Sequence, residues 1–303
     1  MARKKKGEDI NGWLIIDKPR DITSNAVVNI TRRIFNANKN GHTGTLDPFA
    51  TGVLPIAFGE ATKLIPYVTD GDKEYEFIIQ WGKETSTDDT EGEIVAESDV
   101  FPSREDILKE IPNFVGTIKQ IPSAFSAIKI NGQRAYDLAR KGEEVDMPER
   151  EVEIYELELL EEFANHQAKF RVACSKGTYV RTLGKDLAKS LGTLGYLLEL
   201  RRTKCGIFSS ADNILLDKIK KIEYKEELAK VLLPIETSLR DIAVIAVSEV
   251  DAAKLRQGQK ISPKNYQVDD FVGKEVVAMF EGVLVAIVGV DVSRISPLRV
   301  FNL

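Results

Sequence analysis

The chain has 303 residues, of which 43% are hydrophobic and 29% are charged. This composition is typical of a globular protein with about two domains, and it excludes collagen-like, low-complexity and fully disordered chains. No apolar run approaches the roughly 20 residues that cross a bilayer, and no apolar segment follows the basic N-terminus as in a secretory signal. The net charge of −5 argues against a nucleic-acid partner, but residues 1–39 carry nine Lys or Arg and four Asp or Glu, and binding responds to the local field.

Cysteine and histidine are scarce, which restricts the chemistry further. Cys174 and Cys205 are too few for a disulfide scaffold or a four-cysteine zinc site. His42 and His166 are too few for a histidine-rich metal site. We therefore expect a cytoplasmic protein that has no membrane contact and needs no metal.

The first hundred residues alternate strand patterns with helix patterns. Residues 13–16 form a short apolar strand, and Thr23 or Ser24 is placed to cap a helix whose apolar residues repeat at helical spacing. Residues 75–81 alternate between apolar and polar side chains, which predicts a strand with one buried face. The acidic segment 84–93 is expected to be a solvated loop or hairpin tip.

The middle of the chain predicts further short elements. Ser103 and Asp106 form a capping-box pattern at the start of a helix. A strand over 126–130 leads into an Asn131-Gly132 turn and a short helix. Further on, the patterns predict strands at 151–160 and 168–174 and a helix from Thr178 to Leu191.

The pattern changes near residue 240, where we place a domain boundary between residues 1–240 and 241–303. Segment 212–240 is mostly helical in pattern. The second domain begins with a helix starting at Ser248. It continues with strand-like runs at 275–280, 283–290 and 298–301.

Residues 41–48, Gly-His-Thr-Gly-Thr-Leu-Asp-Pro, concentrate two glycines, a histidine and a carboxylate. Glycines allow a backbone to approach a ligand closely. The phosphate-loop spacing is absent, and neither His42 nor Asp47 has a metal-ligating partner nearby. Segment 84–93 likewise lacks the spacing of a calcium loop. On the residues alone, Asp47 is either a catalytic carboxylate or the start of an ordinary turn before Pro48.

Two further residues could carry chemistry. Arg181 lies just off the apolar face of its predicted helix, close to the helix start, where positive charge is mildly unfavourable. It is either a surface arginine or the partner of a carboxylate. Tyr75 shares a strand face with Phe77 and Trp81, so it is either a core aromatic or a ring facing a cleft.

These segments occur in an order and spacing that resembles the bacterial TruB family, the tRNA pseudouridine-55 synthases. The resemblance spans about residues 10–210 and rests on several independent motifs. One departure is Ser86, where the family often has aspartate, and we expect little effect because that loop is peripheral. The matching motifs are 12–19, GHTGTLDPFATGVLPIAFGEATK at 41–63, Lys73-Glu74-Tyr75, Gly82 with 85–92, IPSAFSAIKINGQRAYDLARKG at 121–142, SKGTYVRTLGKDLA at 175–188 and LRRTKCG at 200–206.

The resemblance implies an RNA isomerase that converts uridine 55 in the TΨC arm of tRNA into pseudouridine without a metal or organic cofactor. It implies an α+β fold with a mixed, mainly antiparallel sheet flanked by helices, the pseudouridine synthase fold. Residues beyond 240 look like a small β-rich domain of the PUA type, which binds RNA. A monomer is the expected state.

The resemblance also assigns roles by position. Asp47 is the expected nucleophile, and Arg181 the residue that keeps it ionised and aimed. His42 matches the residue that occupies or steadies the opening left by the flipped base, and Tyr75 matches the ring that stacks on that base. We also expect Tyr75 to be catalytic, with its hydroxyl helping to move the proton that C5 loses after the new bond forms. Tyr179 and Leu200 match substrate-pocket residues, while Arg32, Arg33, Arg201, Arg202 and Lys204 are expected to contact phosphates.

Two other functions would make different demands on the sequence. A tRNA-binding folding helper would need none of the aspartate, tyrosine and arginine positions, yet all are intact. A nucleotide-phosphate hydrolase would need a phosphate loop and metal ligands, which the sequence lacks. The isomerase is therefore the leading hypothesis.

Overall fold

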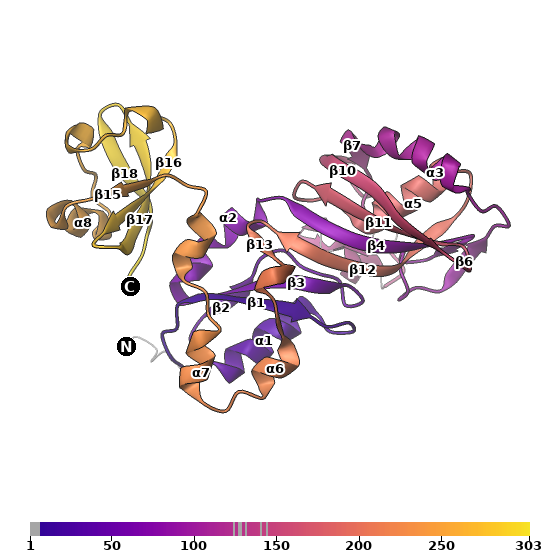
Figure 1. Ribbon diagram of the computed structural model, residues 1–303, viewed down its shortest axis with the longest axis horizontal. Coiled ribbons are helices and arrows are strands. Elements are labelled where there is room, and N and C mark those ends of the chain that lie inside the picture. The colour runs from indigo at the N-terminus through magenta and orange to yellow at the C-terminus, as the bar shows by residue number, and fades with distance from the viewer. Residues whose placement is uncertain (1–6, 124, 127–128, 131, 140, 144) are drawn as a thin grey trace.

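The computed structural model describes residues 7–123, 125–126, 129–130, 132–139, 141–143 and 145–303 (Figure 1). The basic residues 3–6 and Asn131 of the predicted turn lie outside this part of the chain. Figure 1 shows one large twisted sheet with helices packed against it and a smaller sheet at one end of the molecule.

The large sheet is mixed and mainly antiparallel, as predicted. Its strands are β1 (Gly12–Lys18), β2 (Asn40–His42), β3 (Thr51–Phe58), β4 (Lys73–Trp81), β7 (Gly116–Gln120), β10 (Arg150–Phe163), β11 (Gln167–Cys174), β12 (Gly195–Cys205), β13 (Phe208–Ser209) and β14 (Ile214–Leu215). Among the described residues their order is β14-β1-β3-β12-β4-β11-β10-β7, with β2 beside β3 and β13 beside β12. Only β1 with β14 and β3 with β12 pair in parallel there.

Short helices connect these strands. Thr23 caps α1, and the predicted capping box of Ser103 and Asp106 opens α3. Two small hairpins, β5 (Lys83–Thr85) with β6 (Ile94–Glu97) and β8 (Lys129–Ile130) with β9 (Gln133–Arg134), stand off the sheet. The helices are α1 (Ser24–Ile34), α2 (Ile65–Thr69), α3 (Arg104–Glu110), α4 (Ala135–Ala139), α5 (Val180–Ser190), α6 (Leu216–Lys220) and α7 (Lys225–Lys230), with 3-10 turns η1 (Gly59–Leu64), η2 (Ile111–Phe114), η3 (Ser210–Asp212) and η4 (Ile235–Leu239).

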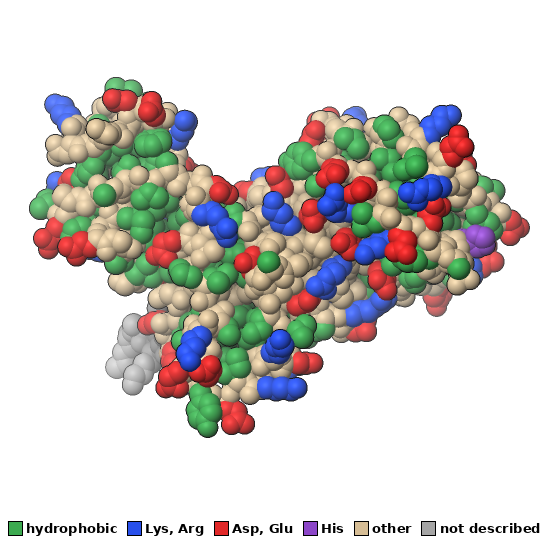
Figure 2. All heavy atoms as spheres, in the orientation of Figure 1, with side chains coloured by type: hydrophobic (Ala, Val, Ile, Leu, Met, Phe, Trp, Pro, Cys, Tyr) green, Lys and Arg blue, Asp and Glu red, His purple; other side chains and the backbone are tan. Residues whose placement is uncertain are grey.

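The two faces of β4 differ, because successive side chains of a strand point to opposite sides. Phe77, Ile79 and Trp81 are buried in the main core, which confirms the predicted alternation. On the other face, Glu76 pairs with Lys169 of β11 at 2.6 Å. Figure 2 shows basic and acidic side chains interspersed over this part of the molecule. Opposite charges on neighbouring strands therefore largely compensate one another on that face.

The C-terminal sheet has its own core. It consists of β15 (Val244–Ala246), β16 (Glu275–Phe280), β17 (Val283–Asp291) and β18 (Arg294–Val300), in that order. Helix α8 (Glu249–Arg256) is capped by Ser248, as predicted, and 3-10 turns η5 (Pro263–Asn265) and η6 (Asp269–Phe271) follow it. The boundary near residue 240 stays a prediction.

A second hydrophobic cluster joins the two sheets. Trp13 of β1 and Phe301, both fully buried, belong to this cluster. Lys63 lies over the Phe301 ring at 5.7 Å and donates a hydrogen bond to the carbonyl of Val300 at 2.7 Å. The last strand of the chain is therefore fastened to the outer face of β1 and β3.

One glycine allows β3 and β12 to approach each other at the centre of the large sheet. Gly52 of β3 lies opposite Arg202 of β12 and has a φ of +100°. A Cβ atom at this position would lie 2.1 Å from the carbonyl oxygen of Arg202. Only glycine tolerates both this φ and this contact.

Replacing Gly52 with alanine tests this close approach. The matched control is Gly116→Ala, since Gly116 has a similar φ of +97° but nothing within 4 Å of its Cβ position. We expect Gly116→Ala to lower the free energy of unfolding by about 1–2 kcal/mol, from backbone strain alone. Gly52→Ala adds about 1–3 kcal/mol of overpacking. Equal losses in denaturant unfolding would contradict the steric account.

Candidate active site

The loop between β2 and β3 carries Asp47 and is held on both sides of it. The Ser24 hydroxyl, at the start of α1, accepts a hydrogen bond from the Leu46 amide at 2.9 Å and donates one to the Leu46 carbonyl at 3.0 Å. The Lys18 ammonium group, at the end of β1, donates to the carbonyl of Pro48 at 3.0 Å. Asp47 is thus fixed between two anchored residues.

Lys18 is a buried cation without an ion pair among the described residues. It donates further hydrogen bonds to the carbonyls of Ile22 at 2.8 Å and Pro19 at 2.9 Å. Burial lowers the pKa of Lys18 to about 8, because desolvation disfavours the charged form. Three carbonyls around one ammonium group tie β1, the start of α1 and the Asp47 loop together.

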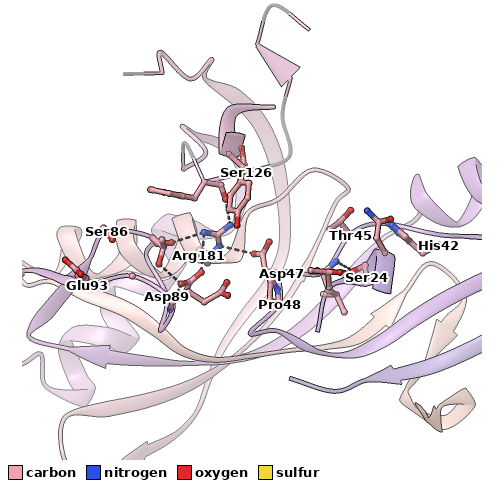
Figure 3. Close-up of a pocket in the computed structure, with 18 residues that line it drawn as sticks. Ser24, His42, Thr45, Asp47, Pro48, Ser86, Asp89, Glu93, Ser126 and Arg181 are labelled. Atoms are coloured by element: carbon pink, nitrogen blue, oxygen red, sulfur yellow. Dashed lines mark hydrogen bonds and ion pairs between the residues drawn. The ribbon is translucent and has the colours of Figure 1, made fainter. Parts of the chain in front are cut away.

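Arg181, in the first turn of α5, connects two carboxylates. Its Nε atom lies 3.0 Å from Asp47 and its Nη1 atom 3.3 Å from Asp89. The remaining donors bind the backbone carbonyls of Thr87 at 2.8 Å and Phe125 at 2.9 Å. Figure 3 shows the guanidinium between the two aspartates. With all these partners in place, the direction from which Arg181 meets Asp47 is fixed.

The two aspartates differ in exposure. The Asp47 side chain is 37% exposed and faces open space, whereas that of Asp89 is 2% exposed. Asp89 also accepts hydrogen bonds from the Thr87 hydroxyl at 2.5 Å and the Glu91 amide at 2.9 Å. Burial is the largest influence on the pKa of Asp89 and raises it. Asp89 therefore supports Arg181, and Asp47 is the carboxylate that a ligand can reach.

Two cavities meet at Asp47. They share Thr45, Leu46, Asp47, Ser126 and Arg181. The first, about 420 Å³, is here called the acidic cavity; besides the shared residues its lining includes Ser24, His42, Ser86, Asp89, Glu91 and Glu93 (Figure 3). The second, about 570 Å³, is called the aromatic cavity; its lining includes Lys73, Tyr75, Arg150, Tyr179, Leu200 and Arg202. Both volumes lie in the range of small-ligand sites.

The structure thus brings most of the expected site residues together. The aromatic cavity is lined by Tyr75 of β4, by Tyr179 and by Leu200 of β12, together with Asp47 and Arg181. His42 lines the acidic cavity, and Figure 3 shows it across Asp47 from Arg181. Burial lowers the pKa of His42, which favours the neutral imidazole at neutral pH.

Tyr179 is held at the start of α5. Its amide donates to the Gln120 side-chain oxygen at 3.0 Å, and the Gln120 side-chain nitrogen donates to the Tyr179 carbonyl at 3.2 Å. The guanidinium of Arg150 lies 5.6 Å from the centre of the Tyr179 ring. A cation close to an aromatic ring stabilises the ring position.

Segment 84–93 differs in two ways from its sequence-based description. It connects the two strands of the β5–β6 hairpin, which confirms one of the two predicted alternatives, but it is not solvated throughout, because Asp88 and Asp89 are buried and pair with Lys185 and Arg181. Ser86 is not peripheral, since it lines the acidic cavity. Both errors have one cause: the partners of this segment lie about a hundred residues further along the chain.

Arginine exposure also differs from expectation. Arg181 is buried, so the surface alternative is excluded. Arg202 does not belong to a surface cluster with Arg201: it is 1% exposed and lines the aromatic cavity. Arg201 instead forms a bidentate ion pair with Asp17, at 3.0 and 2.7 Å. Neighbouring residues of a strand point to opposite faces, so the two arginines separate.

Sequence reasoning gave no role to Lys18 or Asp89 and placed Arg202 among the phosphate contacts rather than in the cavity. Lys18 precedes a proline after an apolar strand, and a lysine there has no pattern that indicates burial. Asp89 lies in a run of acidic residues, and nothing in the sequence distinguishes it from its neighbours. The strand alternation of β12 could have separated Arg202 from Arg201, but a β-bulge between Arg202 and Lys204 interrupts the pattern.

Among the described residues, no group of three or more His, Cys, Asp or Glu side chains is placed to hold a metal ion. The helices in the same part of the chain include none long and apolar enough to span a membrane.

Comparison with known proteins identifies the family. The family model described as "TruB family pseudouridylate synthase (N terminal domain)" matches residues 32–180, and that of the "tRNA pseudouridylate synthase B C-terminal domain" matches residues 181–240. The chain is 47% identical to the tRNA pseudouridine synthase B of Caulobacter vibrioides, with 100% of both chains covered. It is 43% identical to that of Rhodospirillum rubrum, again with 100% of both covered.

Among solved structures, the fold matches a chain of an H/ACA ribonucleoprotein bound to a substrate RNA containing 2′-deoxyuridine. The TM-score is 0.72 at 22% sequence identity, and the match covers 100% of this chain and 92% of the other. That structure supports the pseudouridine synthase fold. The family models and the full-length relatives show that the chain belongs to the TruB family of pseudouridylate synthases.

Proposed function

We propose that this pseudouridine synthase acts on tRNA and isomerises uridine 55 of the TΨC arm. The observation that carries the proposal is the placement of Asp47, which Arg181 holds at 3.0 Å at the mouth of a cavity lined by aromatic rings. The relatives are named as tRNA enzymes, and the sequence motifs resemble those of position-55 enzymes.

The reaction rearranges bonds without any net gain or loss of atoms. The N1–C1′ glycosidic bond breaks, the uracil turns, and C5 bonds to C1′. C5 then loses its proton and N1 gains one. Asp47 is the nucleophile, and it adds to C1′ or to C6 and later leaves, which divides one difficult step into two. No step needs a redox cofactor.

Arg181 fixes the position of the nucleophile, since its Nε atom lies 3.0 Å from Asp47. Because the other donors of Arg181 are already bound to Asp89 and two backbone carbonyls, the guanidinium cannot turn away when substrate enters. Positioning of this kind contributes to the rate because the reacting groups start close together.

The uracil must leave the RNA stack to reach Asp47, since a paired or stacked base is inaccessible. The aromatic cavity would receive it, with Tyr75 stacked on the base and Tyr179 and Leu200 around the nucleotide. His42, beyond Asp47, is placed to occupy the opening that the flipped base leaves in the RNA.

The C-terminal residues 241–303 are proposed to form a PUA-like domain that binds RNA. Their separate core and four-stranded sheet support this. The full chain acts in the cytoplasm, as a monomer, and requires no metal or organic cofactor.

The test of the function is direct. An unmodified tRNA transcript is incubated with the protein, and pseudouridine is mapped along its length. Modification at position 55 is expected, and a transcript with cytidine at that position should remain unmodified. Pseudouridine at other positions only, or none at all, would refute the proposal.

Asp47→Asn should abolish turnover while leaving tRNA binding within a few-fold. The amide retains the shape of the side chain but is a poor nucleophile, so we expect a loss of roughly a thousandfold or more in single-turnover rate. The control is Asp217→Asn, because Asp217 is an exposed aspartate that pairs with Lys220 at 2.8 Å. Near wild-type turnover by Asp47→Asn would remove this residue from the mechanism.

Asp89 and Asp88 form a matched pair for testing the support of Arg181. Both are buried, but Asp88 binds Lys185 at 2.9 Å and Asp89 binds Arg181. Asp89→Asn should lower the single-turnover rate by about 10–100-fold, since a small displacement of a catalytic group has effects of this size. Asp88→Asn should lower thermal stability and leave the rate of the folded protein almost unchanged. Equal rate losses would show that neither acts through Arg181.

A further inference from the structure

Arg202 is a buried cation that the mechanism above does not use. Its side chain is among the largest fully buried ones in the chain, yet it reaches the aromatic cavity. No carboxylate among the described residues lies within ion-pair distance of it. Burying a charge without a counter-charge is costly, so the fold maintains this arrangement against a considerable penalty.

Two backbone carbonyls fix the guanidinium. Nε donates to the carbonyl of Val53 at 2.8 Å, and Nη2 donates to that of Gly44 at 3.1 Å. Both acceptors belong to the segment that contains Asp47, one on each side of it. The guanidinium is planar and rigid, so these two bonds determine where its remaining N–H groups point.

Tyr75 is the neighbour of Arg202 on the adjacent strand. Arg202 lies directly opposite Tyr75 in the pairing of β12 with β4, so both side chains project to the same face of the sheet. Both side chains line the aromatic cavity, and the Arg202 charge acts to lower the pKa of the Tyr75 hydroxyl. The phenol therefore lies beside a fixed cation inside the cavity that contains Asp47.

We propose that Arg202 is the positioning residue of Tyr75: it orients the phenol oxygen and stabilises negative charge on that oxygen during removal of the C5 proton. This inference rests on the proposed function. After the C5–C1′ bond forms, the Tyr75 phenolate, whose proton has passed to water, accepts the C5 proton. The electrons of the C5–H bond restore the C5=C6 double bond, and the phenol returns its proton to water.

Electrostatics supports the need for such a cation. Burial raises the pKa of Tyr75 to about 12, and the charge of Arg202 is the largest influence opposing that rise. Each further pKa unit would reduce the phenolate fraction about tenfold. Loss of Arg202 should therefore slow proton removal at neutral pH by about tenfold or more, since a neighbouring opposite charge is typically worth about 1–3 pKa units.

The experiment measures single-turnover pseudouridine formation at saturating protein, with tRNA carrying protium or deuterium at C5 of the target uridine. The single-turnover rate of Arg202→Met should be about tenfold or more below that of the wild type. The C5 isotope effect of this variant should exceed that of the wild type, because proton removal becomes rate-limiting. The rate of the variant should also rise with pH, at higher pH values than the rate of the wild type does. The control is Arg171→Met, which removes a guanidinium that pairs with Glu156 and Glu158 on the exposed face of β11. It should match the wild type.

A double-variant cycle separates this role from simple packing. If Arg202 acts through Tyr75, then Arg202→Met should cost little further rate in a Tyr75→Phe background, because the hydroxyl it serves is already absent. If Arg202 only supports the fold, the two losses should multiply.

Arg202→Lys covers the case in which Arg202→Met does not fold. Lysine retains the charge but cannot reach both carbonyls and the phenol together, so an intermediate rate and an enlarged isotope effect are expected. An unchanged isotope effect in the folded variant, or multiplying losses in the cycle, would overturn this inference while leaving the isomerase assignment intact. A wild-type protein that forms no pseudouridine would instead overturn the proposed function.

Discussion

The shared guanidinium of Arg181 is the interaction on which the rest of the site depends. It joins α5 to the Asp47 loop and to the segment that carries Asp89, elements that are far apart in sequence. A lone buried arginine would be costly, and a lone buried carboxylate equally so. Arg181 is shared between buried Asp89 and the more exposed Asp47. The buried positive and negative charges are thereby paired, and the Asp47 carboxylate stays accessible to a ligand.

The same principle recurs around the loop. Lys18 and Arg202 are also buried cations, and each binds backbone carbonyls of residues close to Asp47. Carbonyl dipoles partly replace the lost hydration of such cations. Loops are usually the more mobile parts of a fold, but this one is held from β1, α1 and β12. The Asp47 carboxylate therefore projects from a loop that three neighbouring elements hold in place.

Local patterns predicted those features that depend on neighbours in sequence. The alternation over Phe77, Ile79 and Trp81, the caps at Thr23 and Ser103, and the small β-rich C-terminal region were all predictable in this way. The motif that contains Asp47 was recognisable because glycines, a histidine and an Asp-Pro pair rarely occur so close together. The sheet class followed from the family resemblance rather than from periodicity.

The remaining features depend on contacts that no local pattern encodes. The acidic composition of segment 84–93 predicted exposure to solvent. Asp88 and Asp89 are buried instead, because they form ion pairs with Lys185 and Arg181 of α5. Arg202 looked like part of a basic cluster, yet strand alternation turns it inward beside Tyr75. Charged residues are buried only when partners are supplied by the tertiary fold, so sequence alone underestimates how many of them a site contains.

The most direct measurement of the account is a structure of the Asp47→Asn protein bound to a TΨC stem-loop. Our account predicts the target uracil in the aromatic cavity, against Tyr75 and near Leu200, with C1′ and C6 facing residue 47. It also predicts that Arg181 keeps its contact with Asp89. A base seated in the acidic cavity beside His42, or still stacked within the RNA loop, would contradict it.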